Sequence, residues 1–198
     1  MKRILAASAL ALSFAACSPA PEESAAGAPN AMVTAEIGAA DGSDATANAA
    51  APAAGDPVLT LEGLGALRIG QPVPTDSSWA VGGAQEADAC AAIRSPDYPG
   101  VYAIVERGAV RRITVAEGSD VKLIEGIGVG ASESAVRADF AGFREEPHKY
   151  VAAPAKYLTA PNADSGDPAL RFEIGERGTV TAIHIGTMPV LGYVEGCG

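Results

Sequence analysis

The chain has 198 residues and is acidic, with 24 Asp and Glu against 14 Lys and Arg and a formal net charge of −10. Six of the acids, and no Lys or Arg, fall in residues 18–57, and the remainder of the chain from Val58 on is also net negative. Because proteins that bind nucleic acids present a basic surface to the phosphates, this charge argues against a nucleic-acid partner.

The N-terminus has the pattern of a secretory signal. Lys2 and Arg3 precede residues 4–16, which are apolar except for Ser8 and Ser13. A bilayer-spanning helix needs about 20 apolar residues, so this segment is too short to be one. A positive start followed by a short apolar run with small residues at its end is typical of a signal peptide. We therefore expect residues 1–16 to be a signal peptide.

The end of that segment, Phe14-Ala15-Ala16-Cys17, resembles the bacterial lipobox, although Phe14 stands where the family usually has Leu. The resemblance implies that the chain is cleaved before Cys17 and that this cysteine carries a lipid anchoring the protein to a membrane. Ser18, rather than Asp, follows the cysteine, which implies the outer membrane of a bacterial envelope, facing the periplasm. An ordinary signal with an incidental cysteine, or a short buried helix, is the alternative.

Residues 18–57 consist almost entirely of Ala, Pro, Gly, Ser, Thr, Asn, Asp and Glu. Such a segment cannot bury enough apolar area to offset the entropy of ordering it. We expect residues 17–57 to be a disordered tether whose ends lie on the order of 35 Å apart. Residues 58–198 then form the folded part, which has the size of one ordinary domain.

Two more cysteines, Cys90 and Cys197, lie in this part. Free thiols are uncommon in the oxidising envelope, so we expect the two residues to form a disulfide. Two buried thiols are the alternative. Neither cysteine has a histidine close in sequence, so we expect no metal site at the cysteines. No other pattern in the sequence predicts a cofactor.

Two ten-residue segments of the folded part are similar. Residues 106–115 read ERGAVRRITV and residues 176–185 read ERGTVTAIHI, seventy positions apart. Upstream, Gly70 and Gly130 both follow aliphatic residues, sixty positions apart. The pattern indicates two tandem units, about 64–122 and 123–196, unless the similarity of two hairpins arose by chance.

Each unit predicts a β-hairpin, around Arg107-Gly108 and around Arg177-Gly178, because glycine supplies the positive φ of a tight turn. Between the hairpins, residues 132–140 have helical spacing, with Ser132 as the N-cap and Gly142 as the stop. The matching residues 71–79 contain prolines and predict only a turn or a short helix. The expected fold class is α+β, in which a helix or turn is followed by antiparallel strands, twice, in one sheet-based domain.

Residues 130–137, GASESAVR, are similar to the opening of small outer-membrane-assembly lipoprotein modules. Two such units in tandem resemble the β-lactamase inhibitor protein family, over about residues 64–196, with residues 71–79 departing from the pattern. The resemblance implies a protein-binding or inhibitor-like module that recognises its partner through a sheet face and has no catalytic residues. It identifies no contact residue in this chain.

Few residues indicate chemistry. His184 lies between Ile183 and Ile185 in a predicted strand, so we expect its side chain to face solvent. His148 follows Glu145-Glu146, a weak metal-binding pattern, since neighbours in an extended chain point in opposite directions.

A loop and a group of arginines have polar patterns that could indicate sites. Residues 162–167 depart from the calcium-loop pattern and predict a polar loop. The three arginines Arg107, Arg111 and Arg112 predict a solvated sheet edge. No nucleophile elbow or phosphate-binding loop is present in the sequence.

Two functions fit these patterns. The favoured one is a membrane-anchored envelope lipoprotein that binds an unidentified envelope protein and is not an enzyme. The alternative is a periplasmic enzyme that uses dispersed carboxylates such as Glu86, Asp88 and Asp97. A deep pocket with converging acids would favour the enzyme.

Overall fold

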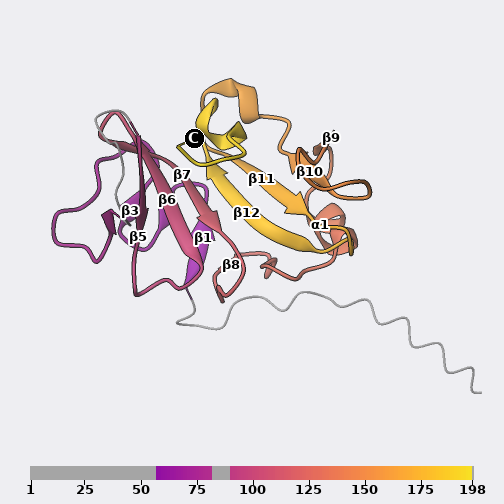
Figure 1. Ribbon diagram of the computed structural model, residues 1–198, viewed down its shortest axis with the longest axis horizontal. Coiled ribbons are helices and arrows are strands. Elements are labelled where there is room, and N and C mark those ends of the chain that lie inside the picture. Colours follow the sequence, from indigo (N-terminus) through magenta and orange to yellow (C-terminus); the bar gives the residue numbers. More distant parts are fainter. Residues whose placement is uncertain (1–56, 82–89, 198) are drawn as a thin grey trace, which may run out of the picture. The chain divides into compact units, whose positions relative to one another are not determined.

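The computed structural model describes residues 57–81 and 90–197. The predicted signal peptide, Cys17 and the predicted tether up to residue 56 lie outside the described residues, as do Glu86 and Asp88. The described part is mostly β-sheet with one α-helix (Figure 1), as the α+β prediction requires. Within it, no helix has the length and hydropathy needed to cross a membrane.

The larger sheet is antiparallel and has eight strands in the order β4-β5-β6-β7-β12-β11-β10-β9. Its strands are β4 (Ala80–Val81), β5 (Cys90–Arg94), β6 (Val101–Glu106), β7 (Ala109–Val115), β9 (Arg144–Pro147), β10 (Lys156–Thr159), β11 (Ala169–Ile174) and β12 (Val180–Gly186). Strands β7 and β12 pair at its centre, with Ile113 opposite Ile185 and Thr114 opposite His184. The sheet therefore consists of two four-stranded halves that meet at this pair.

A smaller four-stranded sheet has the order β3-β2-β1-β8. Its strands are β1 (Val58–Thr60), β2 (Gly63–Leu64), β3 (Leu67–Arg68) and β8 (Lys122–Leu123), of which β1 and β8 pair in parallel. The helix is α1 (Glu133–Asp139), and two short 3₁₀ helices are η1 (Ala163–Ser165) and η2 (Val190–Gly192).

Both predicted hairpins form. Strands β6 and β7 are joined by Arg107 and Gly108 with φ of 53° and 76°, and two positive φ values are what a two-residue hairpin turn of type I′ requires. Strands β11 and β12 pair around a turn in which Gly178 has a φ of 67°. The predicted helix also forms: the Ala135 amide donates to the Ser132 hydroxyl at 3.2 Å, so Ser132 caps α1. Residues 71–79 contain no helix, in line with their prolines.

The same hydrogen-bond pattern occurs beside each hairpin. The Gly70 amide donates to the Val110 carbonyl at 2.7 Å, and the Val110 amide donates to Gln71 at 2.9 Å. The Gly130 amide likewise donates to the Val180 carbonyl at 2.8 Å, and the Val180 amide donates to the residue after Gly130 at 2.8 Å. In both places a segment that precedes the hairpin in sequence is hydrogen-bonded to the hairpin's second strand.

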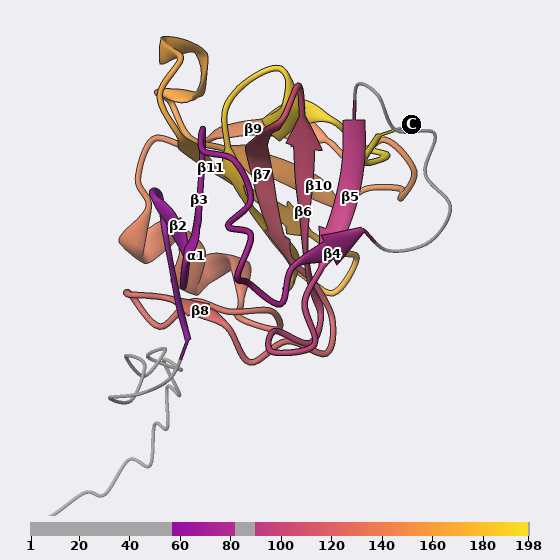
Figure 2. The same cartoon turned by 90° about the vertical axis from the view of Figure 1, so that its left-hand side faces the viewer.

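One face of the large sheet packs on the small sheet and on α1 to form the core. Alternate side chains of a strand point to opposite faces, and on the central strands Ile113, Val115, Ile183 and Ile185 point to this face and are buried. The main contributors are Leu59, Leu64, Leu67, Val101, Ala103, Ile113, Val115, Leu123, Ile127, Val136, Leu158, Leu170, Phe172, Ile183 and Ile185. Figure 2 shows the small sheet and α1 on this side of the large sheet.

The C-terminal segment, residues 187–197, lies on the other face. The Arg112 side chain points to that face from β7, and its Nη1 donates to the carbonyls of Val190, at 3.2 Å, and of Tyr193. Near the end of the chain Cys197 lies at disulfide distance from Cys90, with 5.7 Å between the Cα atoms. This pairing of cysteines is the one that the sequence predicted, and it joins the C-terminal segment to the start of β5.

Replacing Cys90 or Cys197 by Ser is expected to lower the free energy of unfolding by about 2–5 kcal/mol, because the bridge closes a long loop in the unfolded chain. The cysteines are 107 residues apart. Chemical denaturation of wild type and variants measures the difference, and adding a reductant to wild type should reproduce the variant's stability. Titratable thiols at both Cys90 and Cys197 in the unreduced, denatured protein would contradict the pairing.

Candidate functional site

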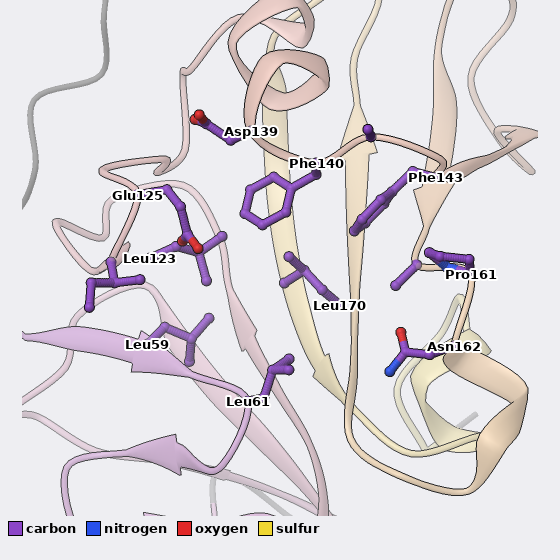
Figure 3. Close-up of a pocket in the computed structure, with 13 residues that line it drawn as sticks. Leu59, Leu61, Leu123, Glu125, Asp139, Phe140, Phe143, Pro161, Asn162 and Leu170 are labelled. Atoms are coloured by element: carbon purple, nitrogen blue, oxygen red, sulfur yellow. The ribbon is translucent and has the colours of Figure 1, made fainter.

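An apolar cavity of about 400 Å³ opens between the small sheet and the end of α1. Figure 3 shows Leu59 and Leu123 of the small sheet on one side of it, and Phe140, Phe143 and Leu170 on the other. The complete lining is Leu59, Leu61, Leu123, Ile124, Glu125, Asp139, Phe140, Ala141, Phe143, Ala160, Pro161, Asn162 and Leu170. Five separate segments between Leu59 and Leu170 thus contribute to one cavity.

Local structure explains why these side chains meet. The chain turns back after β8, where the Gly126 amide donates to the Leu123 carbonyl at 2.9 Å, and this turn carries Ile124 and Glu125 to the mouth of the cavity. Helix α1 ends at Asp139 with Phe140 as its C-cap, and Gly142, with a φ of 80°, redirects the chain toward β9.

The aromatic side of the cavity is rigidly supported. The rings of Phe140 and Phe143 lie 5.6 Å apart, and each lies within 5.8 Å of the fully buried ring of Phe172 on β11. Tilted aromatic pairs at this spacing attract one another beyond their burial. The cavity is therefore formed by side chains that the core holds in place.

Two apolar side chains at the mouth are exposed to solvent. Leu61, which follows β1, is 43% exposed, and Ile124 is 69% exposed. They are two of the four large hydrophobic residues that are exposed in the described part of the chain. Because exposed apolar groups that surround a concave site mark binding surfaces, we regard the cavity as the candidate functional site.

The polar side chains at the cavity are two carboxylates and one amide, those of Glu125, Asp139 and Asn162. Neither carboxylate forms an ion pair with any other described residue. No Lys, Arg or His lines the cavity. The lining thus combines an apolar floor with unneutralised negative charge at the mouth.

A second notable cluster lies on the opposite face of the large sheet, beneath the C-terminal segment. One row across the sheet is almost entirely polar; by strand register it runs Arg94, Tyr102, Thr114, His184, Arg171, Thr159 and Arg144. The middle of the row is buried, although its ends are exposed. Within the row Thr114 and His184 hydrogen-bond to each other, whereas Arg171 and Thr159 both contact the Glu146 carboxylate.

Beside the centre of this row the Glu173 carboxylate of β11 lies between two histidines. The Nε2 atom of His184 lies 3.1 Å from one carboxylate oxygen, and the Nε2 atom of His148 lies 3.5 Å from the other. On its other side, His184 Nδ1 lies 2.8 Å from the Thr114 hydroxyl. A neutral His184 with its proton on Nε2 satisfies both contacts, since it donates to Glu173 and accepts from Thr114.

Burial determines the protonation of this cluster. Loss of hydration lowers the pKa of His184, and the nearby Arg112 and Arg171 lower it further, against the opposing effect of the Glu173 hydrogen bond. Burial alone would raise the pKa of Glu173, but its contacts with the histidines outweigh burial and lower it. At neutral pH the cluster accordingly holds an ionised Glu173 beside a neutral His184.

Two of the sequence-based predictions about single residues are wrong. His184 is only 4% exposed and does not face solvent, because residues 187–197 cover its side of the sheet. Arg112 is 1% exposed and lies on a central strand, whereas the sequence predicted a solvated edge. Only Arg107 of the predicted basic edge is exposed, at the hairpin turn, while Arg111 is half-buried.

The other weak candidates stay apart from the cavity or form no metal site. His148 contacts Glu173 through Nε2, and its Nδ1 accepts hydrogen bonds from the backbone amides of Tyr150 and Val151. Residues 162–167 form η1 and a polar turn, in which Asp164 pairs with Arg144 at 2.8 Å. Asp97 is exposed in the turn after β5 and does not line the cavity. Residues 57–81 and 90–197 contain no cluster of potential metal ligands.

Comparisons with known proteins identify no relative of this chain. No protein-family model, curated protein or solved structure matches the chain.

The lowered pKa of His184 predicts that the domain loses stability in mild acid. The unfolded chain protonates this histidine near pH 6.5, whereas the folded chain does so only at lower pH. The stabilising contribution is therefore complete above about pH 6.5 and declines as the pH falls below that value, by at most about 1.4 kcal/mol per pH unit. Urea unfolding at several pH values measures this slope.

The variant His184→Gln keeps a polar side chain in the buried row. Whatever its overall stability, its free energy of unfolding is expected to change less with pH just below pH 6.5 than that of wild type. The second histidine supplies the matched control, His148→Gln. An unchanged slope in His184→Gln would show that His184 titrates equally in the folded and unfolded chains.

Proposed function

We propose that this protein is a lipid-anchored binding module of the bacterial cell envelope, whose folded domain recognises another protein. In this proposal the lipid on Cys17 attaches the chain to the outer membrane, and residues 17–57 serve as the tether. The domain, residues 58–198, faces the periplasm and presents the cavity to its partner.

The observation that carries the proposal is the apolar cavity with exposed Leu61 and Ile124 at its mouth. Exposing such side chains to water does not stabilise the fold. A partner that covers them removes their apolar area from water, and this burial favours binding. The lining also offers no Ser, Cys, His or Lys side chain that could act as a nucleophile or base. Binding is therefore better supported than catalysis.

The enzyme alternative has little support from the same geometry. Of its three carboxylates, Asp97 lies away from the cavity, and Glu86 and Asp88 are outside the described residues. The two carboxylates that do line the cavity, Glu125 and Asp139, flank an apolar floor. A polar substrate such as a sugar would find few hydrogen-bond partners on that floor.

We also propose that the domain consists of two tandem units, about 64–122 and 123–196. Three features support this: the similar hairpins, the matching hydrogen bonds of Gly70 and Gly130, and the mirrored strand order on either side of β7 and β12. The units differ in that only the second contains α1, since prolines occupy the matching place in the first.

The tandem arrangement is in keeping with the resemblance to the β-lactamase inhibitor protein family, which would bind through a sheet face. In this chain one face of the large sheet forms the core, and residues 187–197 cover the middle of the other. We therefore place the protein-binding site at the cavity rather than on the sheet.

The anchor is tested with Cys17→Ala, which should abolish labelling by a radioactive or clickable fatty acid because no thiol remains at the lipobox. The matched control is Cys90→Ser, which removes a different cysteine and should keep the label. Wild-type protein should sediment with outer-membrane fractions. Fatty-acid labelling that persists in Cys17→Ala, or recovery of wild type in inner-membrane fractions, would refute the proposed anchoring.

A further inference from the structure

We infer that the cavity receives a bulky apolar side chain from a protein segment rich in Lys and Arg. The inference rests on the proposed function, since it names the chemistry of the partner for the same site. It follows from the shape and composition of the cavity, from the charge at its mouth and from the exposure of the residues around it.

The floor of the cavity requires an apolar occupant. Leu59, Leu123, Phe140, Phe143 and Leu170 line it, and a polar group placed against them would lose its hydrogen bonds to water. A volume of about 400 Å³ lies within the range of ligand pockets and is large enough for an aromatic or long aliphatic side chain. Such a side chain is the usual anchor of a protein interface.

The mouth of the cavity requires positive charge in the occupant. Glu125 and Asp139 line it without an ion-pair partner in the described part of the chain, and Glu62 follows Leu61 in an exposed turn. On the side of Asn162 the nearby Asp164 is already paired with Arg144. An approaching segment thus meets a net negative rim, which attracts Lys and Arg beside the apolar anchor.

The exposed apolar residues indicate a protein rather than a small ligand or a membrane. Leu61 and Ile124 lie outside the floor, at the mouth, where a small enclosed molecule would leave them in water and a polypeptide would cover them. A membrane is disfavoured by charge, because bacterial and other anionic lipid surfaces repel an acidic rim. The chain as a whole, at −10, repels such surfaces too.

The inference is tested by selecting peptides from a random library displayed on phage, with the full chain purified in detergent as the target. Two cavity variants are compared with wild type. Ile124→Lys removes an apolar residue at the mouth and adds a charge; Glu125→Lys with Asp139→Lys reverses the rim charge. All three residues are exposed, and Asp139 ends a helix, where a cation is favourable, so the fold should be retained.

The matched control reverses two exposed carboxylates elsewhere, Asp76→Lys with Glu176→Lys, and so changes the net charge equally without touching the cavity. Enriched peptides should contain Phe, Leu, Ile or Trp next to Lys or Arg. Their affinity should fall at least about tenfold in Ile124→Lys and in the rim double variant, and by less than about threefold in the control. Raising the salt concentration should weaken binding to wild type.

Several results would overturn the inference. Peptides that bind wild type but lose no affinity in the cavity variants would leave protein binding intact and move it to another surface. Enrichment of acidic or uniformly polar peptides would contradict the proposed partner chemistry. Failure to enrich any peptide, together with tight binding of a fluorescent fatty acid that Ile124→Lys abolishes, would assign the cavity to a lipid. Wild-type protein that takes up no fatty-acid label would instead contradict the proposed function, because it would have no lipid anchor.

Discussion

The pairing of β7 with β12 is the interaction on which the rest of the domain depends. It joins the two four-stranded halves into one sheet, with Ile113 opposite Ile185 and Val115 opposite Ile183 on the core face. Gly186 permits the close approach of the two strands, because a Cβ atom there would overlap the Arg111 carbonyl oxygen. Without this pair each half would have an exposed strand edge and an uncovered apolar face.

The same pairing determines what lies on each side of the sheet. On the core face it brings together the aliphatic residues of both halves, over which the small sheet and α1 pack, and the gap between these two elements is the cavity. On the other face it places Thr114 beside His184, within reach of Glu173. The C-terminal segment covers this polar row and is held there by Arg112 and by the pair of Cys90 and Cys197. Cavity and polar cluster thus share one structural origin.

Much of the fold could be predicted from the sequence because its signals are local. The glycines at 108 and 178 mark the hairpins, Ser132 and Gly142 bracket the helix, and the prolines in residues 71–79 exclude a helix there. The burial of His184 and Arg112 could not be predicted, since it depends on a distant C-terminal segment that covers the sheet. The cavity could not be predicted either, because its lining comes from five separate parts of the chain and no short motif indicates it.

The central claim is that the cavity binds a protein in the envelope, and photo-cross-linking in living cells tests it most directly. Benzoylphenylalanine is placed at Ile124, at the mouth of the cavity, or at Tyr150, an exposed aromatic position that does not line it. The account predicts a discrete protein adduct from position 124 that is absent from position 150 and is lost when Glu125 and Asp139 are changed to Lys. Equal adducts from both positions, or adducts from position 124 with lipid alone, would contradict it.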